Sequence, residues 1–196
     1  MFALTVDQKS SRTGSDLVAE ELAELRVHDG LLLGPERTVG DEFQLLTAEA
    51  RTALRLILHL TRRGVWSVGV GVGTVEAPLP PSIREARGEA LIHARDAVES
   101  AKSEPTRLSI NGDVHAEHAQ SLVRLLIELR DRRSEKGWEV YDVLAENVTQ
   151  REAARRLGIT PAAVSLRVSA ARLHLEEQAL PALENALARA DADASA

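Results

Sequence analysis

The chain has 196 residues, of which 44% are hydrophobic and 28% are charged, and its formal net charge is -6. This length accommodates one large or two small domains with real cores, and the absence of cysteine excludes disulfides and thiolate metal sites and suits a reducing cytoplasm. No segment approaches the roughly 20 apolar residues of a membrane span, and no secretory signal precedes Asp7, so we expect a cytoplasmic protein that does not bind membranes.

Hydrophobic periodicity and turn residues predict an α+β arrangement in the first half of the chain. The expected elements are, in order, a strand over 2–6, a helix over 15–25, two strands of a hairpin between 31 and 46, a helix over 48–63, a strand from 66, a helix over 84–102 and a strand over 106–110. This order is that of a split βαβ, ferredoxin-like sheet with helices on one face. We therefore place a first domain over residues 1–112.

The strand that begins at Trp66 alternates glycine with β-branched residues, through Gly69, Gly71 and Gly73. A glycine face of this kind lets a helix or a ligand approach the backbone closely. The spacing of these glycines fits neither a Walker loop nor a dinucleotide fingerprint, and the Lys-Ser/Thr pair of a Walker loop does not follow them. A phosphate loop is therefore excluded here.

Four segments carry a resemblance that covers the first domain. They are Val6-Asp7 at the end of the first strand, Val39-Gly-Asp-Glu-Phe43 in the hairpin, the glycine-rich strand over 68–73 and the helix segment over 88–95. In this order they resemble class III nucleotidyl cyclase and GGDEF-type catalytic domains. The resemblance implies that Asp7 and Asp41 would hold two Mg²⁺ ions beside a bound nucleotide, with Arg95 as a matching cation.

The catalytic pattern of those domains is incomplete in this chain. Leu91, Ile92 and His93 occupy the region in which a cyclase offers its transition-state asparagine, and Val39 replaces the first glycine of GGDEF. We therefore expect a protein that is not an enzyme. Three roles stay open for the domain: a dimerisation body, a sensor that binds a nucleotide or Mg²⁺ at Asp7 and Asp41, or an active cyclase.

The histidines give no metal site that the sequence alone can identify. His115 and His118 have helical ligand spacing, but neither cysteine nor a third histidine lies near them. Zinc is therefore not expected at this pair, and no Ser/His/Asp set is recognisable. We expect no resident cofactor beyond the Mg²⁺ or nucleotide that the resemblance implies.

A connecting helix and a charged break follow the first domain, over residues 113–136. The helix extends from His115 to Arg133 and has a broad apolar stripe, and four cations lie in or after its end: Arg130, Arg132, Arg133 and Lys136. We interpret this break as a solvated turn, with phosphate contact as the alternative.

Residues 149–168 have the pattern of a helix-turn-helix. Thr149 and Glu152 form a capping box at a helix start, and Gly158 supplies the left-handed residue that ends that helix. Thr160 then caps a second helix whose first position holds Pro161. Within the second helix Val164 and Val168 face the first, and the opposite face would enter the major groove of DNA.

Arginines are concentrated in this segment. Their forked side chains bind phosphate oxygens or the edge of guanine. The residues that we expect to contact DNA are Arg151, Arg155, Arg156, Thr160, Pro161, Ala162, Ser165, Arg167, Ser169 and Arg172. The alternative is a helical hairpin that only packs or dimerises.

The segment resembles the helix-turn-helix of bacterial regulators and of the promoter-reading region of sigma factors, and the whole chain resembles the SatD family. This resemblance implies a bacterial transcription regulator. From the residues themselves we place an all-α DNA-binding domain over 137–190, followed by a disordered tail over 191–196. An apolar stripe after the second helix, interrupted at Pro181 by a kink or a new helix start, would pack internally or pair two subunits as a homodimer. The alternative from another class is a nucleotide-binding enzyme of the cyclase type.

Overall fold

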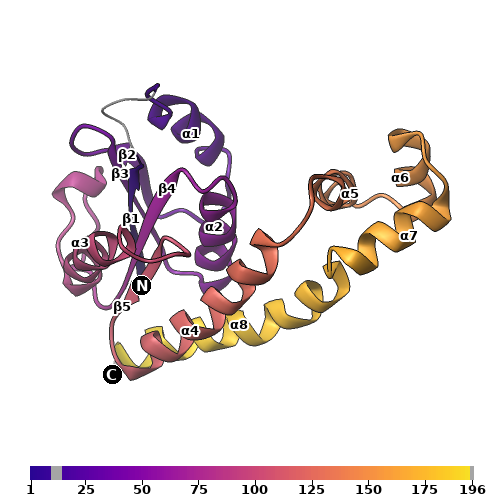
Figure 1. Ribbon diagram of the computed structural model, residues 1–196. Coiled ribbons are helices and arrows are strands. Elements are labelled where there is room, and N and C mark those ends of the chain that lie inside the picture. Colours follow the sequence, from indigo (N-terminus) through magenta and orange to yellow (C-terminus); the bar gives the residue numbers. More distant parts are fainter. Residues whose placement is uncertain (10–14, 195–196) are drawn as a thin grey trace. The chain divides into compact units, whose positions relative to one another are not determined.

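The computed structural model describes residues 1–9 and 15–194 and has a mixed α+β fold with one five-stranded sheet and eight α-helices in that part of the chain (Figure 1). The strands are β1 (Phe2–Gln8), β2 (Leu33–Arg37), β3 (Glu42–Thr47), β4 (Trp66–Val72) and β5 (Leu108–Asn111). The helices are α1 (Val18–Leu25), α2 (Ala50–Arg62), α3 (Glu89–Ala101), α4 (Val114–Asp131), α5 (Glu135–Ala145), α6 (Gln150–Leu157), α7 (Pro161–Ala170) and α8 (Leu173–Ala194), with a 3-10 turn η1 at Ile83–Glu85. No helix among the described residues is long and apolar enough to cross a membrane.

The chain forms two compact units. The first unit comprises Met1–Ile127 and Leu183–Ala196, and the second comprises Glu128–Ala182. Our expected boundaries over 1–112, 113–136 and 137–190 differ from this division, because residues 183–190 of α8 belong to the first unit. Leu183 and Leu187 are buried there, and apolar burial ties the end of α8 to that unit.

The sheet of the first unit has the strand order β2-β3-β1-β4-β5. β1 is antiparallel to both β3 and β4, and β5 joins β4 in parallel through α3. Side chains along β1 alternate between the two faces, so Phe2, Leu4 and Val6 share one face while Ala3 and Thr5 share the other.

Helices cover both faces of this sheet, which corrects our expectation of helices on one face. α3 packs on the face of Gly69 and Gly71, where an added Cβ would lie within 2.6 Å of α3 backbone atoms. α1 and α2 lie on the opposite side of the sheet from α3 (Figure 1). The glycines of β4 therefore admit a helix, one of the two partners that we expected.

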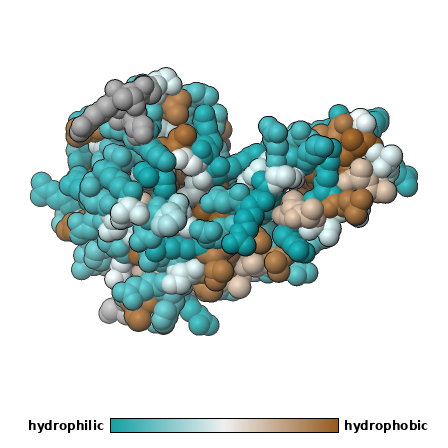
Figure 2. Space-filling model, in the orientation of Figure 1, coloured by the Kyte–Doolittle hydropathy of each residue, from teal (hydrophilic) through white to brown (hydrophobic). Residues whose placement is uncertain are grey.

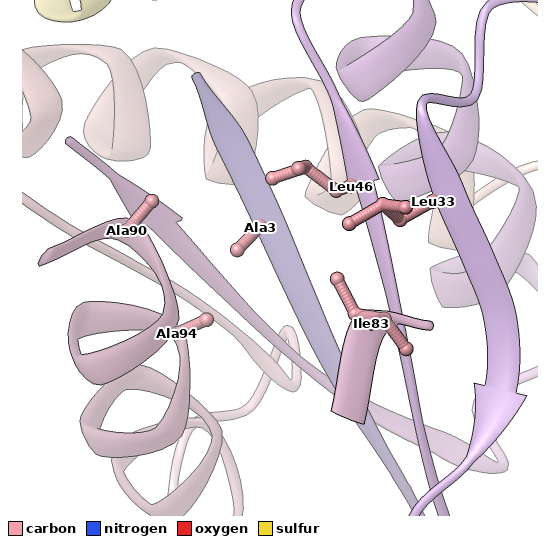
Figure 3. Packing of buried hydrophobic residues seen from close by; sticks show 6 residues of the cluster. All are labelled: Ala3, Leu33, Leu46, Ile83, Ala90 and Ala94. Atoms are coloured by element: carbon pink, nitrogen blue, oxygen red, sulfur yellow. The ribbon is translucent and has the colours of Figure 1, made fainter. Parts of the chain in front are cut away.

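The core on the α3 face is built from small side chains. Ala90 and Ala94 of α3 cluster with Ala3 and with larger residues of β2, β3 and η1, as Figure 3 shows. α3 begins only at Glu89, later than our expected helix over 84–102, because Gly88 adopts a φ of 144° that interrupts helical geometry. Close helix-to-sheet packing thus follows directly from alanine and glycine at facing positions.

The opposite face carries the large side chains. Trp66 and Phe43 are fully buried, and their rings meet edge to face with centroids 5.4 Å apart. α2 covers this face with a buried apolar stripe that includes Leu54 and Ile57. Edge-to-face aromatic pairing adds about 0.5–1.5 kcal/mol beyond area burial.

α8 continues as one helix through Pro181 and runs to Ala194. No new helix starts at the proline, and residues 191–194 are helical where we expected a disordered tail; residues 195–196 lie outside the described residues. Asp191 forms an ion pair with the N-terminal ammonium of Met1, and Arg51 lies 3.8 Å from Glu184. These contacts within the first unit give the end of α8 partners that a free tail would lack.

Candidate nucleic-acid interface

The second unit contains two short helices, α6 and α7, joined by a sharp turn. Thr149 Oγ1 accepts a hydrogen bond from Glu152 N at 3.2 Å, and Thr160 Oγ1 accepts one from Ala163 N at 3.1 Å. Gly158 adopts φ 64° and ψ 30° and ends α6 in the left-handed conformation. Each cap and the turn therefore follow the local sequence signals that predicted them.

The core of this unit brings α5, α6 and α7 together. Val140, Ala153, Ala154, Val164 and Val168 form a buried cluster. The spacing of Val164 and Val168 predicted that they face the first helix, and their burial in this cluster confirms it. α5 contributes Val140 to this cluster, so α6 and α7 pack against each other and against α5 around a common core.

The outer face of α7 is exposed and built mainly from small side chains. Pro161, Ala162, Ser165 and Ser169 are all exposed, and Leu166 is 72% exposed. Figure 2 shows hydrophobic and neutral residues interrupting the hydrophilic surface in the part where Figure 1 draws α6 and α7. Small side chains let a helix approach a flat or grooved partner closely, because they add little bulk.

Two arginines of α6 share an acidic partner on the same helix. Glu152 Oε1 accepts hydrogen bonds from Arg155 at 2.7 Å and from Arg156 at 3.0 Å. These bonds hold the pKa of the Glu152 carboxyl below its ordinary value. The Glu152 carboxylate thus pairs with arginines, where we expected it to complete the capping box. Arg156 also contacts Glu146, and both arginines stay exposed and can exchange these partners for phosphate.

The remaining arginines of the motif differ in their surroundings. Arg151 and Arg172 are exposed. Arg167 is 22% exposed and reaches Glu139 of α5 at 2.9 Å. Arg167 therefore links α7 to α5, although we expected it on the DNA-facing surface. Arg172 has a φ of 57°, a left-handed conformation that is uncommon for a residue with a side chain.

The second unit contains a buried group of charged side chains from the end of α4, the segment after it and the start of α8. Arg130 and Arg133 are 4% and 7% exposed and both form ion pairs with Glu176 of α8. The guanidinium of Arg133 lies 4.3 Å from the ring centroid of Trp138 and 5.0 Å from that of Tyr141. These two arginines are thus buried and paired, so for them both interpretations of the charged break, a solvated turn or a phosphate contact, are wrong. Arg132 and Lys136 are exposed. Sequence reasoning missed Glu176, because it lies 46 residues from Arg130.

The two carboxylates expected to hold Mg²⁺ lie near each other in the first unit. Asp7 is the next-to-last residue of β1 and lies opposite Glu42, and Asp41 occupies the turn before β3. Burial raises the pKa of the Asp7 carboxyl above its ordinary value; Lys102 opposes this shift and Asp41 adds to it. Lys102 Nζ lies 3.6 Å from Asp7 Oδ2, so a side chain of the protein supplies a cation at the position where Mg²⁺ was expected.

Arg95 does not join this carboxylate pair. Lys102 follows the C-terminal end of α3 and reaches Asp7, whereas Arg95 stands seven residues earlier, about 10 Å along the helix axis. Arg95 lines a separate pocket with Gln44, Thr74 and Arg84. The structure therefore brings Asp7 and Asp41 together and leaves Arg95 apart, and sequence reasoning missed Lys102 as their neighbour.

Comparison of the chain with protein-family models, with curated proteins and with solved structures gave no match. The resemblance to the SatD family and to cyclase domains therefore remains a prediction that depends on the quoted segments of the chain.

Proposed function

We propose that the protein is a DNA-binding transcription regulator that reads duplex DNA through α6 and α7. The observation that supports this best is the pair of capped helices around Gly158, with an exposed outer face on α7. A helix presented in this way fits the major groove, and the preceding helix crosses the backbone.

The charge distribution supports the same proposal. Residues 147–175 contain five arginines and one acidic residue, whereas the whole chain has a net charge of -6. Phosphate contacts supply most of the affinity in sequence-independent DNA binding. Arg151, Arg155, Arg156 and Arg172 are all exposed and fit this role, while the short side chains at 162, 165 and 169 favour close backbone approach over extensive base reading.

For the first unit we propose a degenerate, ferredoxin-like and cyclase-like body without catalytic activity. The order β2-β3-β1-β4, with helices after β1 and β3, supports the split βαβ topology. The ion pair between Lys102 and Asp7 argues against two Mg²⁺ ions at this site, because the ammonium already offsets the negative charge. Nucleotide binding at Asp7 and Asp41 stays the alternative.

We further propose that the regulator is a homodimer, since a dimer matches the two half-sites of a palindromic operator. An exposed apolar stripe on α4 supports this: Val114 and Leu122 are about half-exposed and Leu125 is 68% exposed. Sedimentation equilibrium tests it, and Leu122→Glu with Leu125→Glu should convert a dimer to a monomer.

Fluorescence anisotropy with labelled random-sequence duplex DNA tests the DNA-binding proposal directly. The comparison uses the full chain, because deletion after residue 136 would also remove the part of α8 that belongs to the first unit. Ser165→Glu places a negative charge on the outer face of α7, and Ser100→Glu makes the same change at an exposed position of α3.

We expect Ser165→Glu to weaken DNA binding by at least tenfold, because the new carboxylate repels phosphate, and Ser100→Glu to leave it within twofold. Equal affinity of the two variants would contradict the assignment of α7 to the interface. Absence of binding by the unmodified protein at low salt would overturn the function itself.

A further inference from the structure

Acidic and histidine side chains of α1 and α2 gather at one point of the first unit. Glu21 and Glu24 lie one turn apart on α1, and His59 lies near the end of α2. One potential ligand atom from each residue lies within 4.8 Å of those of the other two. In the described part of the chain this is the only group of three such residues that close together.

The geometry of the group is close to that of a coordination sphere. His59 Nε2 lies 2.8 Å from Glu21 Oε1 and 3.8 Å from Glu24 Oε2. Nitrogen and oxygen ligands about 2.1 Å from a tetrahedral Zn²⁺ are separated from one another by about 3.4 Å. The two observed separations bracket this value, so small side-chain rotations would bring the atoms around one ion.

Glu21 is the residue that makes this group unusual. Its side chain is 1% exposed, and a buried carboxylate is costly unless it is paired or bound to a metal. Trp66 Nε1 donates to Glu21 Oε2 at 3.0 Å, which fixes the carboxylate with Oε1 directed at His59. A hydrogen bond to the outer oxygen is the arrangement that orients carboxylate ligands in metal sites.

Two other side chains lie next to this group: the imidazole of His28 and the guanidinium of Arg63, a cation that would compete with a metal ion for Glu21. The ring of His28, just beyond α1, lies 5.7 Å from that of His59. Arg63 NH1 lies 3.7 Å from Glu21 Oε2, on the oxygen that also accepts from Trp66. The guanidinium therefore offsets part of the Glu21 charge on the Oε2 side, while Oε1 faces His59 and is hydrogen-bonded to its Nε2.

We propose that Glu21, Glu24 and His59 bind a divalent transition metal of the Zn²⁺ class and so tie α1 to α2. One imidazole and two carboxylates are ligands that Zn²⁺ and Co²⁺ accept. The site is independent of the DNA-binding proposal, since all its residues belong to the first unit. Sequence reasoning missed it because His59 lies 38 residues from Glu21.

The test is calorimetric titration of the full chain, first treated with a chelator and dialysed, with ZnCl₂, together with the visible absorption of added Co²⁺. Glu24→Gln is the main variant, because Glu24 is half-exposed and its substitution should leave the fold intact, as circular dichroism can verify. His59→Gln removes the nitrogen ligand, and Trp66→Phe removes the outer hydrogen bond.

Two controls separate this site from surface histidines. His174→Gln alters an exposed histidine that lies 3.7 Å from Glu177, and the double variant His115→Gln with His118→Gln removes the neighbouring rings of α4. Both controls alter residues of helices other than α1 and α2.

We expect one Zn²⁺ per chain, affinity at least tenfold lower in Glu24→Gln and His59→Gln, affinity about 10–100-fold lower in Trp66→Phe, and unchanged affinity in both controls. At equal concentration, Zn²⁺ should also raise the unfolding temperature of the unmodified protein more than that of Glu24→Gln. Absence of stoichiometric binding, or binding that survives Glu24→Gln and His59→Gln, would overturn the proposal and leave the group as an ion-pair network.

Discussion

The two units obtain their cores in different ways. The first unit buries large apolar side chains on one face of a sheet, including Phe2, Leu4 and Trp66. The second unit buries mainly valine and alanine and adds the charged group of Arg130, Arg133 and Glu176 at its base. Burial of apolar surface stabilises a fold by about 25 cal/mol per Å², and small side chains bury little of it. The stability of the second unit therefore depends far more than that of the first on one buried polar group.

This difference indicates where each unit is vulnerable. A sheet covered on both faces depends on steric fit, whereas a small helical unit around a buried ion-pair group depends on charge pairing. The two tryptophans allow the units to be followed separately, because Trp66 lies in the first and Trp138 in the second. In protein labelled with 5-fluorotryptophan, ¹⁹F NMR gives one signal for each.

The largest effect is expected from Glu176→Ala. The substitution leaves two buried guanidinium groups without their carboxylate, which costs about 3–5 kcal/mol. The Trp138 signal should then unfold at markedly lower urea concentration, ahead of the Trp66 signal. Glu177→Ala, at an exposed neighbour, is the control and should shift neither transition; equal behaviour of the two variants would refute the role of the buried charges.

Gly71→Ala is expected to destabilise the first unit instead of the second. A Cβ at this position would lie 1.9 Å from the carbonyl oxygen of Ala90, and backbone atoms of α3 cannot move aside independently. We expect a loss of about 3 kcal/mol, at the upper end of the usual cost of overpacking, seen first at Trp66. Gly40→Ala, where no atom lies within 4 Å, should cost only about 1 kcal/mol for its positive φ.

A smaller effect, of opposite sign for stability and binding, is expected from Arg172→Gly. Glycine relieves the left-handed conformation of residue 172 and should raise the free energy of unfolding by up to about 1 kcal/mol. The same change removes an exposed cation from the proposed DNA-binding surface, so DNA affinity should fall. Urea unfolding and anisotropy measured on one preparation test this, and a parallel loss of stability and affinity would indicate a structural role for the arginine.

The smallest effect is expected from Asp7→Asn. The pKa of the Asp7 carboxyl is raised in the folded state, so its contribution to stability is fully present below the ordinary value of 3.8 and is lost as pH rises through the folded pKa. The variant should therefore be slightly more stable than the unmodified protein at neutral pH, and the difference should vanish below pH 3.8. Asp96→Asn, at an exposed position of α3, controls for loss of charge alone. A less stable Asp7→Asn at neutral pH would show that the ion pair with Lys102 outweighs burial.

Local signals made the helix-turn-helix predictable. Thr149, Gly158, Thr160 and Pro161 act through hydrogen bonds and dihedral preferences within a few residues, so their effects can be read directly from the sequence. The alternation of Gly69 and Gly71 likewise predicted a close approach to the strand, although it could not distinguish a helix from a ligand.

Contacts between distant residues could not be predicted. Lys102 meets Asp7, Glu176 meets Arg130 and Arg167 meets Glu139 only because the tertiary fold brings their elements together. Charged side chains carry no periodic signal that reveals a partner, so their burial and pairing become visible only in three dimensions. For the same reason, the sequence predicted that Arg167 faces DNA and did not predict its ion pair with Glu139 of α5.

The central claim is that the exposed arginines of α6, together with Arg172 after α7, contact DNA phosphates, and the salt dependence of binding tests it most directly. Anisotropy titrations of duplex DNA across a salt series would compare the unmodified protein with Arg151→Ala/Arg155→Ala. We predict that the affinity of the unmodified protein falls steeply with salt and that the double variant has a slope of log K against log salt lower by about 1.8, since each lost phosphate contact removes about 0.9. Identical slopes, or no binding by the unmodified protein at low salt, would contradict the claim.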